Sequence, residues 1–135
     1  MSRSAIYVAN ISSQNVLENG VINLGTVVRR FGPNLNLAGN AIQISGAGYY
    51  DINATITLDP TGAGTATIKM LKDNVEVQGA VSSATVEDTE GVVTLPLSAL
   101  IRENCCCCEG LSNLTFVLEG IGAEVTNVAV VVEKI

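Results

Sequence analysis

Four consecutive cysteines, Cys105–Cys108, are the residues of this chain best suited to chemistry, and the chain has no others. Thiolates bind zinc, but structural zinc sites usually place two ligands two to four residues apart and draw the other pair from elsewhere. In an extended segment, Cys105 and Cys107 would point to one side, and Cys106 and Cys108 to the other. A single run is therefore a poor tetrahedral site by itself.

Three interpretations of this run stay open. Reduced thiols pack as small apolar side chains in an interface between copies of the chain. Disulfides, within or between copies, form where the protein meets oxidising conditions. Metal ligation by Cys105, Cys106, Cys107 and Cys108 is the third, although the 135 residues include no histidine. We expect no other cofactor, and Arg102 and Glu103 are placed to tune a thiolate.

Enzyme chemistry has little support, because without histidine the usual Ser-His and Cys-His nucleophile pairs cannot be assembled. Paired carboxylates of a glycosidase type would have to come from Asp51, Glu87, Asp88 and Glu90. Calcium would have to use loop oxygens from Asp59, Asp73, Glu87 and Asp88, and nothing resembles the twelve-residue calcium loop. Acidic residues in turns are mostly solvated, so we expect a protein that is not an enzyme.

The net charge of −6 and the sequence pI near 4.4 argue against a nucleic-acid partner, which needs clustered Lys and Arg. Only Arg29 and Arg30 form a basic pair, and we interpret them as a solvated strand end or an intersubunit ion pair. No stretch approaches the roughly 20 apolar residues of a membrane span, and the first residues lack the apolar region of a secretory signal. We expect no membrane partner and synthesis in the cytoplasm.

The elements that must position these residues are β-strands. From Tyr49 to Leu58 apolar and polar residues alternate without a slip, which is typical of a strand with one face on a core. The same pattern and its turn signals predict further strands at intervals of about ten residues. The expected strands are 6–11, 21–29, 35–37, 41–44, 49–58, 65–72, 75–78, 83–87, 92–97, 114–119 and 125–133.

No segment has a convincing helical stripe, and the best candidate, Ser98–Asn104, is barely two turns. Val128–Val132 is apolar on both faces, so its strand should be central in the sheet or at an interface. Many short strands with Gly-rich turns predict an all-β jelly-roll sandwich, as one domain over residues 1–135. With 47% apolar and only 15% charged residues, we also expect an oligomer.

Several segments resemble the tumour necrosis factor and complement-head superfamily of jelly rolls, which trimerise about a three-fold axis. They are Ala47–Tyr50, the turn Lys72–Asn74 and the ending Thr126–Ile135. The whole chain is more similar to small jelly-roll proteins and head domains of Firmicutes and their phages, to which the segment Ile22–Gly32 and the cysteine run belong. No collagen-like Gly-X-Y repeat occurs here, which favours a free-standing protein over the head of a spore-surface stalk.

The resemblance implies a structural role for a homotrimer on a phage virion, as a head decoration, fibre or tail component whose partners are capsid or tail proteins. The apolar residues Tyr7, Phe31 and Val128–Val132 would close this trimer, and a three-fold axis would bring three copies of each cysteine together. The alternative is a ligand- or glycan-binding head on a bacterial or spore surface, in which Tyr49 or Asp51 would contact the ligand.

Overall fold

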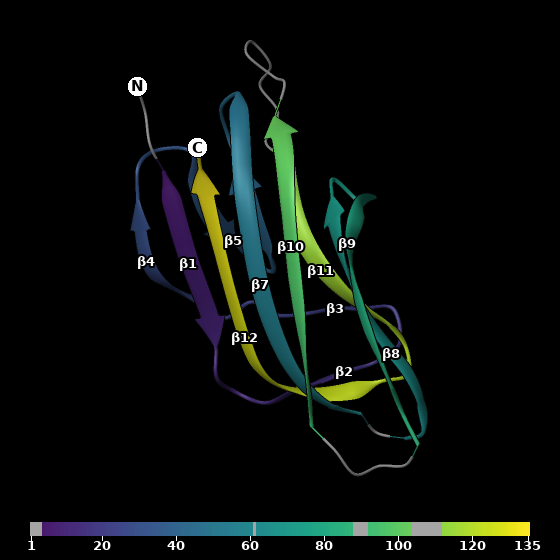
Figure 1. Cartoon of the computed structure of the whole chain (residues 1–135). Helices are drawn as coiled ribbons and strands as arrows, with labels where there is room; N and C mark the ends of the chain where they lie inside the picture. The colour runs from purple at the N-terminus through teal and green to yellow at the C-terminus, as the bar shows by residue number, and fades with distance from the viewer. Residues whose placement is uncertain (1–3, 61, 88–91, 104–111) are drawn as a thin grey trace.

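Two antiparallel β-sheets lie face to face and bury the apolar faces of their strands between them (Figure 1). The computed structural model describes residues 4–60, 62–87, 92–103 and 112–135. The first sheet has the order β10 (Val93–Glu103), β7 (Gly48–Pro60), β12 (Ala123–Lys134), β1 (Ala5–Asn10) and β4 (Thr26–Phe31), and β2 (Gln14–Val16) pairs with β12. The second has the order β5 (Leu35–Ala38), β6 (Ala41–Ile44), β11 (Ser112–Gly120), β8 (Gly64–Lys72) and β9 (Val75–Val86), and β3 (Gly20–Val21) pairs with β11.

The predicted alternation along β7 is confirmed. Tyr50, Ile52, Ala54, Ile56 and Leu58 face the core with at most 3% of their surface exposed. The residues between them, from Tyr49 to Thr57, face outward on the first sheet. Because the side-chain period of a strand is two, this pattern alone fixes which face of β7 is inside.

The last strand lies in the middle of the first sheet, between β7 and β1, as its apolar run predicts. Val128, Val130 and Val132 are buried in the core, whereas Ala129 and Val131 lie on the outer face. The strand therefore contributes only alternate residues to any surface that another copy of the chain could cover.

Three strand predictions need correction. Residues 98–103, within the best helix candidate, continue β10 as a strand, and the described residues include no helix. The pieces 75–78 and 83–87 are one strand, β9, which passes through Gly79 at a φ of 85°. The stretch 21–29 is two strands, β3 and β4, separated by residues 22–25. At Gly25 the φ is 84°, and a Cβ would lie 2.2 Å from the carbonyl oxygen of Ala9.

The two ends of the described chain meet at one end of the sandwich, which we call the terminal end. The backbone N–H of Lys134 donates to the carbonyl of Ser4 at 2.8 Å, and that of Ile135 donates to Tyr49 at 3.0 Å. Glu103 and Gly48 are register partners there, so β10 also ends at this place. Among the described residues, no helix is long and apolar enough to cross a membrane.

Candidate functional site

The cysteine run Cys105–Cys108 lies outside the described residues, between the last residue of β10 and the first of β11. It remains the chain's candidate for metal ligation or disulfide formation on the grounds of sequence alone. In the part of the chain that the structure describes, no group of three or more His, Cys, Asp or Glu side chains is arranged to hold a metal ion.

The predicted carboxylate sites are not brought together within the described residues. Asp51 lies on the outer face of the first sheet, opposite Leu100 on β10 and Glu133 on β12. The Asp73 side chain lies in a turn and is already hydrogen-bonded, because its Oδ1 accepts the backbone N–H of Asn113 at 2.9 Å. Asp59 belongs to β7 and Glu87 is exposed at the end of β9, while Asp88 and Glu90 lie outside the described residues.

The outer face of the first sheet has an apolar patch made by Ala5, Tyr7, Phe31 and Val131. Phe31 is 57% exposed, Val131 40% and Tyr7 37%. The register brings them together, because Tyr7 is opposite Val131 on β12, and Ala5 is opposite Phe31 on β4. With Ile6 and Arg29 these residues surround a shallow hollow of about 140 Å³. The patch is the place on this sheet best suited to contact another protein surface.

Tyr7 and Phe31, which the sequence analysis expects in an interface between copies, both belong to this exposed patch. Of the expected segment Val128–Val132, however, only Ala129 and Val131 face outward, because Val128, Val130 and Val132 are in the core. Further along the same face, the outward residues of β7 are polar: Asn53, Thr55 and Thr57. The apolar patch therefore lies on the side of the sheet formed by β12, β1 and β4. Further apolar surface on this face comes from Leu100 on β10, which is 59% exposed, and Tyr49 on β7, which is 47% exposed.

The side chains of the adjacent residues Arg29 and Arg30 lie on opposite faces of β4, because consecutive residues of a strand point to opposite faces. Arg29 is opposite Tyr7 and borders the apolar patch. Arg30 is opposite the buried Ile6, so its side chain leaves β4 on the side of the second sheet. Its Nε donates a hydrogen bond to the carbonyl oxygen of Leu35 on β5. Arg30 therefore joins the neighbouring edges of the two sheets.

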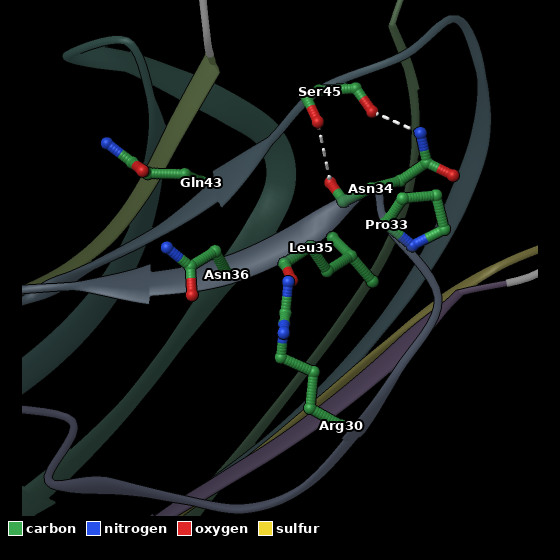
Figure 2. A pocket seen from close by; sticks show the side chains of 7 residues that line it. All are labelled: Arg30, Pro33, Asn34, Leu35, Asn36, Gln43 and Ser45. Atoms are coloured by element: carbon green, nitrogen blue, oxygen red, sulfur yellow. Dashed lines mark hydrogen bonds between the residues drawn. The ribbon is translucent and has the colours of Figure 1, made fainter.

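A polar hollow of about 280 Å³ opens around Arg30, and we call it the arginine pocket. Figure 2 shows the side chains that line it, with the Arg30 side chain extending towards Leu35. Its lining consists of Arg30, Pro33, Asn34, Leu35, Asn36, Gln43 and Ser45. Asn36 and Gln43 are direct cross-strand partners on β5 and β6, and both point away from the core.

Asn34 makes one wall of this pocket rigid. Its side-chain Nδ2 donates to the carbonyl of Ser45, while its own carbonyl accepts the hydroxyl of Ser45 at 3.5 Å (Figure 2). The same Asn34 carbonyl also accepts the backbone N–H of Ser45 at 2.8 Å. Its Oδ1 accepts the hydroxyl of Ser4 at 3.0 Å and lies 3.5 Å from the Nζ of Lys134. One side chain thereby ties the β5–β6 hairpin to both ends of the described chain.

A second polar cluster is buried at the terminal end. The hydroxyl of Ser112 donates to the carboxylate of Glu103, and both residues are less than a tenth exposed. The hydroxyl of the buried Tyr50 donates to the carbonyl of Gly46 at 2.9 Å. Burial, and next the negative charge of Glu103, raise the pKa of the Tyr50 phenol above its ordinary value. This cluster ties strands together and has no free nucleophile.

Comparisons with known proteins find solved structures of the same fold but no match to a family model or a curated protein. Among solved structures, murine APRIL aligns with a TM-score of 0.74 and 8% identity, over 98% of this chain and 99% of its own. The globular domain of the zebrafish complement 1qA protein aligns with a TM-score of 0.66 and 6% identity, over 97% of this chain and 94% of its own.

The PRD1 vertex protein P5 aligns with a TM-score of 0.67 and 16% identity, over 98% of this chain and 96% of that protein. These likenesses confirm the predicted fold, an all-β jelly-roll sandwich of the tumour necrosis factor and complement-head type. Identities this low show the fold alone. What the chain does has to be argued from its own surface.

Sequence reasoning treated Arg29 and Arg30 as one feature and missed the arginine pocket. The signal was present in part, because Leu35–Leu37 and Ala41–Ile44 were both expected as strands with polar residues between apolar ones. Pairing them across the turn places Asn36 opposite Gln43. Nothing in the sequence, however, indicates that the edge strand of the other sheet brings Arg30 to this hairpin.

Proposed function

We propose that this chain is a homotrimeric structural head domain of a virus particle, where it decorates the head or forms part of a fibre or tail. The apolar patch of Ala5, Tyr7, Phe31 and Val131 carries this proposal. Three exposed large apolar side chains on one sheet face cost solvation free energy in a monomer, and a neighbouring copy removes that cost by covering them.

The particle setting is supported by the alignment with the PRD1 vertex protein P5, which covers nearly the whole of both chains. By its name, that protein is a vertex protein. A structural role also suits a chain that has no histidine and whose described residues include no cluster of metal ligands. The partners in this proposal are other copies of the chain and the capsid or tail proteins on which its loops dock.

The test has two parts. Light scattering on the purified protein should give a mass of three chains of 14.0 kDa each. Mass spectrometry of purified particles, from the virus or prophage whose genome contains the gene, should find the chain in a fixed ratio to the capsid protein. A monomer would overturn the trimer, and absence from the particles would overturn the virion role.

A second candidate function is a ligand- or glycan-binding head on a bacterial or spore surface. The arginine pocket favours it, because a hollow with polar side chains converging on it is the usual form of a small-molecule site. The genes beside this one separate the two candidates: capsid and tail genes support the first, and sporulation or surface-anchoring genes support the second. The expected ligand contacts Tyr49 and Asp51 do not line this pocket.

A further inference from the structure

The arginine pocket holds a positive charge that no acidic group neutralises. Its lining contains Arg30 and no Asp or Glu. Both ion pairs found among the described residues belong to Lys69, with Glu76 and Glu119 on the second sheet. Lys134 adds a second positive charge next to Asn34, with its Nζ 3.5 Å from Oδ1. In a chain with a net charge of −6, this is an unusual local environment.

The Arg30 guanidinium is also oriented in advance. Its Nε is held by the carbonyl oxygen of Leu35, which fixes the plane of the group relative to β5. Its two terminal amino groups have no hydrogen-bond partner among the residues described. A guanidinium presents these donors in a fixed fork that matches the two oxygens of a carboxylate. Arg30 therefore fits an anionic group with two oxygens on one atom, which a carboxylate provides.

The remaining free polar groups suit hydroxyls. The side-chain amides of Asn36 and Gln43 make no hydrogen bond within the described part of the chain, and each offers both a donor and an acceptor. They are direct partners across β5 and β6, so they stand side by side on the outer surface. Paired amides of this kind can bind the neighbouring hydroxyls of a sugar, which also both donate and accept.

The shape of the site limits the size of the ligand. A hollow of about 280 Å³ lies just below the roughly 300–1,000 Å³ of sites for drug-sized ligands. The exposed ring of Pro33 supplies an apolar surface for the C–H face of a pyranose. Asn34 and Ser45 are tied to each other and hold the wall in place.

We propose that the arginine pocket binds an acidic monosaccharide unit of the hexuronate type, with its carboxylate on Arg30 and its hydroxyls on Asn36 and Gln43. This inference rests on the second candidate function, whose ligand it names. It does not depend on assembly, because the whole pocket lies within one chain.

The experiment is an NMR titration of the full chain with sodium glucuronate, with glucose and inorganic phosphate as comparison ligands. Glucuronate should bind saturably and shift the side-chain amide signals of Asn36 and Gln43. Arg30→Gln should weaken binding at least about tenfold, because it removes the charge-assisted pair. Arg29→Gln is the matched control: it removes the same charge from the adjacent residue, which borders the apolar patch instead, and should change affinity less than twofold.

Several results would overturn the proposal: no saturable shift with glucuronate, equal binding of glucose, tighter binding of phosphate, or equal losses in the two arginine variants. If Arg30→Gln does not fold, the double variant Asn36→Ala with Gln43→Ala is used instead. If this double variant binds glucuronate as tightly as the wild type, the proposal is overturned. A glucuronate-terminated oligosaccharide tests the source of the sugar. Tighter binding than the free sugar supports the end of a glycan, and equal binding supports a free monosaccharide.

If a glycan array instead finds a neutral glycan that needs Asn36 and Gln43, the hexuronate assignment fails and the binding-head function stands. If the array finds no ligand and glucuronate does not bind, both fail together.

Discussion

The hydroxyl of Ser112, the first residue of β11, donates a hydrogen bond to the carboxylate of Glu103, the last residue of β10. The two strands belong to different sheets, so this contact joins the sheets at the terminal end. Both residues are buried, and a buried carboxylate without its donor is costly. Glu103 and Ser112, which flank the segment containing the cysteine run in the sequence, are thus hydrogen-bonded to each other.

We expect Ser112→Ala to lower the free energy of unfolding by roughly 1–3 kcal/mol, because it leaves the Glu103 carboxylate without this donor. Urea denaturation measures the change. Ser98→Ala is the control, since Ser98 is an exposed residue of the same strand as Glu103 and should change stability by less than about 0.5 kcal/mol. Equal stabilities of the two variants would mean that the buried contact contributes nothing.

Tyr50 should make the fold sensitive to high pH. Its folded pKa is raised, chiefly by burial and secondarily by Glu103, so the native state holds the phenol proton more tightly than the unfolded chain does. The resulting stability is fully present below the unfolded pKa of about 10 and is lost as the pH rises through the folded pKa. The free energy of unfolding should therefore fall above about pH 10.

Tyr50→Phe isolates the contribution of the Tyr50 phenol. Near neutral pH the variant should be about 1 kcal/mol less stable, because it loses the hydrogen bond to Gly46. Above about pH 10 its stability should fall less steeply than that of the wild type. Parallel pH profiles for the two proteins would show that Tyr50 does not carry the alkaline transition.

Two glycines with positive φ, Gly120 and Gly39, give a prediction with an internal control. Gly120 has a φ of 90°, and a Cβ there would lie 2.0 Å from the carbonyl oxygen of Thr65. Gly39 has a φ of 60° and nothing within 4 Å of its Cβ position. Gly39→Ala should cost roughly 1–2 kcal/mol from backbone strain alone, and Gly120→Ala clearly more, because β8 must also move. Thermal unfolding of both variants measures the difference, and equal costs would contradict the clash.

The sequence predicts the inside of this fold better than its edges. The alternation of Tyr50, Ile52 and Ala54 with polar residues depends only on the strand period, so it could be read without tertiary information. The continuation of β10 beyond Leu97 could not, because Leu100 faces outward and Glu103 is buried, which breaks the alternation of apolar and polar residues. β10 is an edge strand, which also tolerates the missing N–H of Pro96.

The candidate site was less predictable for a related reason. Arg30 reaches Leu35 because two edge strands from different sheets run beside each other, and that depends on the packing of the whole sandwich. Local patterns give the face on which a side chain lies, but not which edge of the other sheet it meets. The cysteine run is the opposite case, since the sequence singles it out and the described residues end on either side of it.

For Cys105–Cys108 we predict that neither dithiothreitol nor EDTA changes the native mass of the protein, because reduced thiols that pack as small apolar groups do not need oxidant or metal. Light scattering under each condition is the measurement. A mass that falls with dithiothreitol would identify intersubunit disulfides, and one that falls with EDTA would identify a shared metal. Changing all four cysteines to serine should then reproduce the fall.

The role of the apolar patch can be tested with a matched pair of valines. Val131 on β12 and Val81 on β9 are each 40% exposed, on the first and the second sheet respectively. Val131→Asp places a charge in the proposed interface between copies, where an unpaired carboxylate would be desolvated, so it should convert the trimer to a monomer. Val81→Asp places the same charge on the sheet that the proposal leaves exposed, and it should keep the mass of three chains.

Light scattering over a dilution series measures both variants, and circular dichroism confirms that each keeps its β-structure. At the interface an aspartate also forfeits the apolar burial of valine, worth about 1.5–3 kcal/mol in each copy. The loss is repeated by symmetry in every subunit contact, so dissociation should be complete at concentrations where the wild type stays assembled. Dissociation by Val81→Asp alone would place the interface on the second sheet. It would leave Tyr7, Phe31 and Val131 facing a different partner.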